Sequence, residues 1–317
     1  MSSRPSVFVI IVTYNGALWI RQCLESLRSS AYPCRPIVVD NASSDGTQRI
    51  VQEEFPEALL LEEKNNHGFG IANNIGIAKA LDLAADYVFL LNQDAYVLND
   101  TIGKLVDALA SNKDYLLATP LHCSPDTSHV DPTTQTWYLQ KYCPDFISDA
   151  CLGQTKDFYP IKGVNAAAWL ISRKAILKAG GFDPLFFMYG EDDDLINRYA
   201  YHGLQFLLVT KSLIVHLRKK SPPTKITWLQ SVKKSGVRIR SNLLSDMKSP
   251  SNNSAALNIL ILICNGILKP TIDFLIDRNI ATLFAHYYAF FSTLKCFRIA
   301  SKNSEACKNE GPHFISQ

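Results

Sequence analysis

Short apolar runs alternate with longer segments of helical periodicity in the N-terminal part of the chain, and this alternation restricts the fold more than any other feature. The segments between the runs place apolar residues at helical spacing, as in residues 68–83. Strands that alternate with helices of about 10–15 residues indicate repeated βαβ units. We therefore expect an α/β fold with a mixed, mainly parallel sheet flanked by helices. The runs typical of buried strands are 6–12, 37–40, 58–61 and 87–91.

The alternation stops at residue 121 and resumes at residue 163. Residues 121–160 hold Pro, Asp, Thr, His and aromatic residues without a sustained period. A loop region of this length inside a domain is usually functional or disordered. Around this break we expect helices over 99–109 and 192–201 and strands over 115–119, 163–172 and 204–215.

The composition is that of a globular protein, since 47% of the 317 residues are hydrophobic and 19% are charged, which excludes wholesale disorder. The eight cysteines show neither the CxxC spacing of zinc sites nor a disulfide framework. We therefore expect a cytoplasmic location. The apolar run near the N-terminus is shorter than a signal-peptide core and leads directly into the first predicted strand.

Polar residues follow four of the predicted strands at the points where the strands end. In an open α/β sheet, ligands bind beyond the carboxyl ends of the strands, so these residues would meet at one edge. Turn and helix-capping chemistry explains each loop equally well when it is taken alone. For Asp94, the two interpretations are a metal ligand and a loop residue that caps a helix. The four groups are Thr13-Tyr14-Asn15, Asp40, the segment 65–70 and Asn92-Gln93-Asp94.

The segment 65–70 contains two glycines just before a predicted helix. Gly68 and Gly70 would allow a phosphate to approach the backbone at the positive end of that helix. The segment lacks the third glycine of the G-x-G-x-x-G motif, which disfavours a dinucleotide site for hydride transfer.

Four consecutive acids, residues 191–194, follow a cluster of aromatic and apolar residues at 186–189. Their mutual repulsion would raise the pKa of at least one carboxyl group and favour a bound cation or a proton-accepting role. The alternative is the ordinary enrichment of acids in the first turn of a helix. His216 ends a predicted strand, where it is either a neutral core residue or a ligand.

Six ordered motifs resemble those of the inverting family 2 glycosyltransferases with the GT-A fold, particularly the bacterial members similar to rhamnosyltransferases. The resemblance extends from about Val7 to Ser221, and it implies a GT-A domain over residues 1–220. The motifs are VIIVTYN at 9–15, VVDNASSDGT at 38–47, NNHGFGIANNIG at 65–76, LLNQDA at 90–95, GGFDPLFFMYGEDDDL at 180–195 and the histidine in SLIVHLRKKS at 212–221.

The resemblance assigns a role to each matching residue. It implies that Asp192, which follows Glu191, is the catalytic base, and that Asp94 and His216 contribute to a divalent cation site. The nucleoside would contact Thr13, Tyr14, Asn15 and Asp40, and the rest of the donor would contact Asn66, Gly68, Phe69, Asn74, Asn92 and Gln93.

The implied reaction moves a hexose or deoxyhexose, such as rhamnose, from a UDP- or dTDP-sugar to a saccharide or a lipid-linked saccharide. Mg²⁺ or Mn²⁺ would stabilise the leaving nucleoside diphosphate, and a carboxylate would deprotonate the acceptor hydroxyl. Inversion at the anomeric carbon would follow, in the synthesis of surface polysaccharide or O-antigen, with residues 121–160 on the acceptor side. The first position of the family's DxD-type motif is Asn92, which leaves one carboxylate for the cation there.

Two other classes of protein remain as alternatives. A catalytically inactive sugar-nucleotide-binding protein is suggested by Asn92. A sugar nucleotidyltransferase would need a Gly-rich, basic phosphate loop after the first strand, and residues 13–16 supply none.

The C-terminal third has a different character. Residues 218–248 hold nine basic residues and one acid, and two apolar segments that we expect to be helical, 255–268 and 280–297, follow. The interpretations are a solvated basic face, a peripheral contact with the inner membrane on its cytoplasmic side, or a homodimer contact. Nucleic-acid binding is disfavoured because few aromatic residues lie among the basic ones. We expect residues 221–300 to form a helical extension and 301–317 a flexible polar tail.

Overall fold

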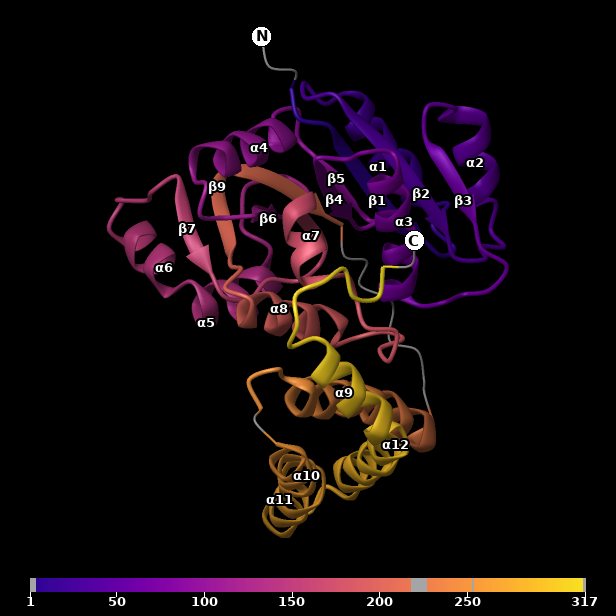
Figure 1. The fold of residues 1–317 in the computed structure, drawn as a ribbon, viewed down its shortest axis with the longest axis vertical. Helices are drawn as coiled ribbons and strands as arrows, with labels where there is room; N and C mark the ends of the chain where they lie inside the picture. The colour runs from indigo at the N-terminus through magenta and orange to yellow at the C-terminus, as the bar shows by residue number, and fades with distance from the viewer. Residues whose placement is uncertain (1–3, 218–226, 253, 316–317) are drawn as a thin grey trace.

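The computed structural model describes residues 4–217, 227–252 and 254–315 (Figure 1). A nine-stranded sheet forms the centre of the α/β part, with the strand order β3-β2-β1-β4-β8-β6-β9-β5 and with β7 paired to β9. The strands are β1 (Val7–Thr13), β2 (Cys34–Asp40), β3 (Leu59–Glu62), β4 (Tyr87–Leu91), β5 (Ala95–Val97), β6 (Leu117–Cys123), β7 (Phe158–Ile161), β8 (Ala168–Ser172) and β9 (Phe206–His216).

The sheet is mixed, with parallel and antiparallel strand pairs, as predicted. The strands β3, β2, β1 and β4 run parallel, as the repeated βαβ units predict. Beyond them β6 and β9 also pair parallel, whereas β8 enters between β4 and β6 and is antiparallel to both. The short strands β5 and β7 also pair antiparallel with β9.

Helices cover both faces of the sheet and give a three-layered domain (Figure 1). One core cluster joins α3, α7 and α8 to one face, and a second joins α1, α2 and α4 to the other. Strand β4 contributes Val88 and Leu90 to the first cluster and Phe89 and Leu91 to the second, so it is buried on both faces. The helices are α1 (Ile20–Arg28), α2 (Thr47–Glu54), α3 (Phe69–Asp82), α4 (Thr101–Ser111), α7 (Arg173–Ala179) and α8 (Glu191–Tyr201).

The segment 121–160 is not the loop region that its composition predicts. Strand β6 continues to Cys123, and the chain then forms a π-helical turn, η1 (Thr134–Leu139), and two short helices, α5 (Gln140–Tyr142) and α6 (Pro144–Cys151). Leu139, Cys143 and Phe146 are buried against the sheet. The apolar positions are too few and too irregular in spacing for a periodic signal.

The C-terminal helices form a separate layer at the far end of the molecule from β1 and α4 (Figure 1). They are α9 (Trp228–Lys248), α10 (Ala255–Ile263), the π-helical turn η2 (Cys264–Leu268), α11 (Lys269–Asp277) and α12 (Ile280–Ala306). Part of the basic segment, residues 218–226, lies outside the described residues.

The prediction of a flexible tail over 301–317 is wrong for its described part. Residues 301–306 continue α12, and the chain then returns to the α/β part. The backbone N–H of Gly181 donates to the carbonyl of His313 at 2.9 Å, and the Arg198 guanidinium lies 5.2 Å from the centre of the Phe314 ring. These contacts depend on partners that are distant in sequence, so the polar composition of the segment did not predict them.

Candidate active site

The loops after β1 and β2 are joined at the carboxyl edge of the sheet. The Thr13 hydroxyl donates to Asp40 Oδ1 at 3.0 Å, and Asp40 Oδ2 accepts from the Ser43 backbone N–H at 2.9 Å and from Gln48 Nε2 at 2.7 Å. Thr13 and Asp40 are both fully buried. The two residues therefore support the loop after β2 from inside the protein.

The exposed groups on this edge are Tyr14 and Asn15. Asn15 has a left-handed backbone, with φ of 49°, and its Oδ1 accepts from the Ser44 N–H at 2.9 Å. The Tyr14 N–H donates to Gln93 Oε1 at 3.2 Å, which ties the end of β1 to the end of β4. Gln93 therefore braces the two strand ends.

Hydrogen bonds and close backbone contacts support the loop before α3. Asn66 Oδ1 accepts from the Gly68 N–H at 2.9 Å and from Asn41 Nδ2 at 3.0 Å. Gly68 has φ of 83°, and a Cβ there would collide with the carbonyl of Phe187. The glycine is needed because the loop and the segment before α8 touch backbone to backbone.

The geometry contradicts the prediction that Asn74 contacts the donor. Its Nδ2 donates to the Phe182 carbonyl at 2.7 Å, and its Oδ1 accepts from the Phe182 N–H at 2.8 Å. Both ends of the amide are used in fastening α3 to the turn after α7. Asn74 lines a different cavity, between α3 and Phe314.

Asp94 and His216 lie together, as the strand-end argument requires. The short strand β5 pairs antiparallel with β9, so that Ala95 is opposite His216. His216 Nε2 lies 3.3 Å from Asp94 Oδ1. The pairing of Ala95 with His216 therefore brings the Asp94 carboxylate next to the His216 ring.

A cavity of about 300 Å³ opens beside this pair. Three polar atoms on its lining residues are buried and have no hydrogen-bond partner among the described residues: Asn92 Oδ1, Glu191 Oε2 and His216 Nδ1. Buried polar atoms are normally satisfied, so unsatisfied ones that gather at one cavity indicate a place for a polar ligand. The cavity is lined by Phe69, Asn92, Thr133, Tyr138, Asn165, Ala166, Ala167, Met188, Tyr189, Glu191, Asp192 and His216.

Some of these lining residues were not predicted individually. Thr133 and Tyr138 come from the segment 121–160, where no periodic pattern pointed to a site. Asn165 lies in the loop before β8, which the apolar pattern had assigned to a strand. Tyr189 was within the aromatic cluster, and its φ of 71° turns the chain sharply into α8.

The four consecutive acids at the start of α8 point to different sides of the helix. Glu191 and Asp192 line the cavity, Asp193 is exposed, and Asp194 is buried on another side of the helix. Burial and the adjacent Asp192 carboxylate raise the pKa of Glu191 to about 8. Burial and the Asp193 carboxylate raise the pKa of Asp192 to about 6. At neutral pH, Asp192 is therefore mainly ionised and Glu191 mainly protonated.

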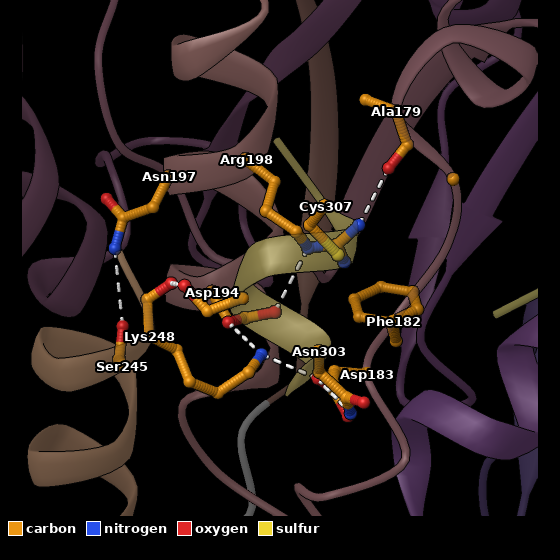
Figure 2. Close-up of polar contacts among 12 residues, drawn as sticks. Ala179, Phe182, Asp183, Asp194, Asn197, Arg198, Ser245, Lys248, Asn303 and Cys307 are labelled. Carbon is orange, nitrogen blue, oxygen red and sulfur yellow. Dashed lines mark hydrogen bonds and ion pairs between the residues drawn. The ribbon is translucent and has the colours of Figure 1, made fainter. Parts of the chain in front are cut away.

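Asp194 belongs to a buried ion-pair network that anchors α8 (Figure 2). Lys248 Nζ, at the end of α9, lies 2.6 Å from Asp194 Oδ1 and 2.6 Å from Asp183 Oδ2. Arg198 Nε lies 3.2 Å from Asp194 Oδ2. Burial alone would raise the pKa of Asp194, but Lys248 and Arg198 outweigh it and lower that pKa.

The same network joins the C-terminal helices to the α/β part. Arg198 Nη1 donates to the Ala179 carbonyl at 2.7 Å, and Asn303 Nδ2 of α12 donates to Asp183 Oδ2 at 3.0 Å (Figure 2). Lys248 is 2% exposed, so the interpretation of 218–248 as a solvated face does not apply to it. Its role depends on carboxylates more than fifty residues away, which composition does not show.

The side chains at the cavity could hold a divalent cation only together with oxygen atoms of a bound ligand. No group of three or more His, Cys, Asp or Glu side chains is arranged to hold a metal in the part of the chain that the structure describes. Asp94 and His216 supply two donors, and the unsatisfied Oδ1 of Asn92 supplies a neutral oxygen at the same cavity. Hard cations accept such oxygens, so the oxygens of a bound diphosphate would have to complete the coordination.

Comparison with known proteins adds a family and a fold. The family model described as Glycosyl transferase family 2 matches residues 8–177. The chain is 26% identical over 241 residues to an N-acetylglucosaminyl-diphospho-decaprenol L-rhamnosyltransferase of Mycobacterium tuberculosis (strain CDC 1551 / Oshkosh), covering 67% of this chain and 76% of that protein. It is also 26% identical over 225 residues to the rhamnosyltransferase WbbL of Escherichia coli (strain K12), and this match covers 66% of this chain and 83% of that protein.

Among solved structures, the chain resembles the mannosyltransferase PcManGT from Pyrobaculum calidifontis in complex with GDP-Man and Mn²⁺. The TM-score is 0.54 at 19% identity, and the match covers 96% of this chain and 86% of that one. The likeness shows a shared GT-A-like fold that extends over nearly the whole chain.

Proposed function

The chain belongs to glycosyltransferase family 2, and on that premise we propose that it transfers rhamnose or another hexose from a dTDP- or UDP-sugar to a saccharide or lipid-linked saccharide, with inversion. The two rhamnosyltransferases found by comparison support the choice of sugar, and the name of the mycobacterial protein supports a lipid-linked acceptor. Surface polysaccharide or O-antigen synthesis is the setting in which such a transfer fits.

The observation that carries the proposal is the cavity with its unsatisfied atoms. Asn92 Oδ1, Glu191 Oε2 and His216 Nδ1 leave hydrogen-bonding capacity at one place, beside the ionised Asp192. A sugar presents several hydroxyl groups and a diphosphate presents several oxygens, so the two together can satisfy these atoms. We assign the nucleoside and the diphosphate to the loops of Tyr14, Asn15 and Asn66. The first two are joined through Tyr14 to Gln93, which follows the cavity-lining Asn92, and the third leads to the cavity-lining Phe69.

Asp192 accepts the proton of the acceptor hydroxyl in this mechanism. With a pKa of about 6, it is ionised at neutral pH and still basic enough to accept a proton as the nucleophile attacks. Glu191, protonated near its pKa of about 8, donates a hydrogen bond into the cavity. Two neighbouring carboxyl groups with separated pKa values divide such roles in many enzymes.

Asp94 and His216, with Asn92, would hold Mg²⁺ or Mn²⁺, which when bound stabilises the charge that develops on the leaving diphosphate. The positive end of α3, which begins at the cavity-lining Phe69, favours the same negative charge. The cation in the PcManGT structure supports this arrangement.

The test is a donor panel with purified protein, in which release of nucleoside diphosphate and transfer to a saccharide acceptor are measured by mass spectrometry. Asp192→Asn should lower turnover by about 10²–10⁴-fold, whereas the matched control Asp107→Asn, at an exposed position of α4, should keep it. Full turnover by Asp192→Asn would refute the assignment of the base. Binding of donors without turnover by the wild type would favour an inactive sugar-nucleotide-binding protein.

A further inference from the structure

The helix α10 exposes apolar side chains and buries a polar one, which is unusual for a helix in water. Its residues Leu257, Ile259 and Leu260 are 39%, 45% and 56% exposed. Its polar residue Asn258 is 6% exposed, and its Oδ1 accepts from Asn252 Nδ2 at 2.8 Å. A surface helix of a soluble protein normally buries its apolar side and exposes its polar one. The outer side of α10 is therefore suited to an apolar environment.

This apolar surface continues along the chain. Residues Ala256–Ile276 form one helical stretch that by length and composition could cross a membrane. An 18-residue part of it has a mean hydropathy of 1.9, and only 17% of that part is buried. The adjacent start of α12 adds exposed apolar side chains to the same layer of helices. The exposed large apolar residues of the segment 268–291 are Leu268, Ile272, Leu275, Ile276, Ile280, Phe284, Tyr288 and Phe291. We call α10 to α12 with these residues the apolar surface.

Positive charge surrounds the apolar surface. Apart from the buried Lys248, residues 228–306 contain nine Lys and Arg and four Asp and Glu, whereas the net charge of the whole chain is only +3. Lys233, Lys234 and Arg238 are exposed on α9, and Lys269 and Arg278 are exposed at the two ends of α11. An anionic partner is therefore favoured over a neutral or cationic one.

We propose that α9–α12 dock this protein on a bilayer that contains anionic lipids, with the apolar surface entering the boundary between headgroups and acyl chains. A second copy of the chain would cover the apolar residues too, but it would bring two surfaces of like charge together, which disfavours association. Anionic headgroups match both the basic residues and the apolar ones beside them.

The helices lie on the bilayer and do not cross it. Lys269 and Asp273 are exposed charged residues inside the apolar stretch, and charges at the bilayer centre are strongly disfavoured. A position at the interface keeps both in contact with headgroups and water.

Docking of these helices has a consequence for the cavity, and this step rests on the proposed function. The Arg238 guanidinium of α9 lies 5.0 Å from the centre of the Tyr189 ring, and Tyr189 lines the cavity. The helix that carries the basic residues therefore reaches the site itself. A saccharide attached to a membrane lipid would be presented on this side of the molecule.

The experiment measures co-sedimentation of the full chain with vesicles, without any sugar nucleotide, so that failure of the proposed sugar transfer does not affect it. We expect binding to phosphatidylcholine vesicles that contain phosphatidylglycerol, and much weaker binding to pure phosphatidylcholine. Leu260→Glu with Ile272→Glu should lower the partition coefficient at least tenfold, because two charges enter the apolar surface. The matched control, Leu152→Glu with Leu177→Glu, changes two exposed leucines of the α/β part and should bind as wild type.

A second variant tests the charge without touching the apolar residues. Lys233→Gln with Lys234→Gln should weaken binding to the anionic vesicles by about 30-fold. Equal binding of the wild type to neutral and anionic vesicles would overturn the electrostatic part of the proposal. Absence of vesicle binding, with a dimer in sedimentation velocity that Leu260→Glu with Ile272→Glu dissociates, would overturn docking on lipid and assign the surface to a second copy.

Discussion

Replacing Lys248 with methionine removes the positive charge between two buried carboxylates while keeping a side chain of similar length. Lys248 Nζ lies 2.6 Å from both Asp183 and Asp194. After the change, Asp194 keeps Arg198 at 3.2 Å, but Asp183 keeps only neutral donors among its described contacts, Asn303 and the Leu185 backbone N–H. The loss of stability should therefore arise mainly from the buried Asp183 carboxylate, which is left without a positively charged partner among the described residues.

Removing one partner of a buried ion pair costs about 3–5 kcal/mol, because an uncompensated charge stays behind. We expect Lys248→Met to lower the free energy of unfolding in urea by this amount at pH 7. The exposed control Lys302→Met, on α12, should change it by less than about 0.5 kcal/mol. Lys248→Arg keeps the charge and should recover part of the loss.

The pH dependence has a definite sign. The folded-state pKa of Asp194 is below its ordinary value of 3.8, so its contribution to stability is present above that pH and is lost as the pH falls further. In Lys248→Met, the stranded carboxylates would instead take up protons more readily, so the difference from wild type should narrow between pH 7 and pH 4.5. A loss below about 1 kcal/mol at pH 7, or a difference that widens on acidification, would refute the reasoning.

Three further predictions concern the site. The pH profile of kcat/KM should rise through about pH 6 as Asp192 ionises and fall above about pH 8 as Glu191 loses its proton; a flat profile between pH 5 and 9 would exclude both assignments. Asp94→Ala should abolish the stimulation of turnover by Mn²⁺, and an unchanged Mn²⁺ titration would show that Asp94 is not a ligand. Gly68→Ala should lower the free energy of unfolding by at least about 1 kcal/mol, because φ of 83° and the Phe187 carbonyl both exclude a Cβ; a wild-type urea midpoint would contradict this.

The sequence predicted the parts of the site that depend on single strands. Each apolar run ends in a polar group, and the carboxyl ends of parallel strands meet, so Thr13, Asp40 and Gln93 lie at one edge as expected. The proximity of Asp94 and His216 is confirmed, although their roles remain predictions. The strand β5, which holds the two together, has only three residues and leaves no periodic signal.

The rest depends on contacts between distant segments. Asn74 matches a family motif, yet its amide fastens α3 to Phe182. Lys248 was counted among basic residues that composition places on the surface, but its partners make it a core residue. Strand β8 runs antiparallel to its neighbours because of the path taken through residues 121–160, and local patterns carry no information on strand direction.

The return of residues 307–315 to the α/β part has a consequence for synthesis of the protein. The carbonyl of His313 accepts from the N–H of Gly181, and Ile315 packs on the core cluster that contains β1 and β4. The first strands leave the ribosome early, but the contacts that close their domain are supplied more than ninety residues after β9. Folding of this domain is therefore completed only after residues 307–315 have been made, and α9–α12 are synthesised while it is still incomplete.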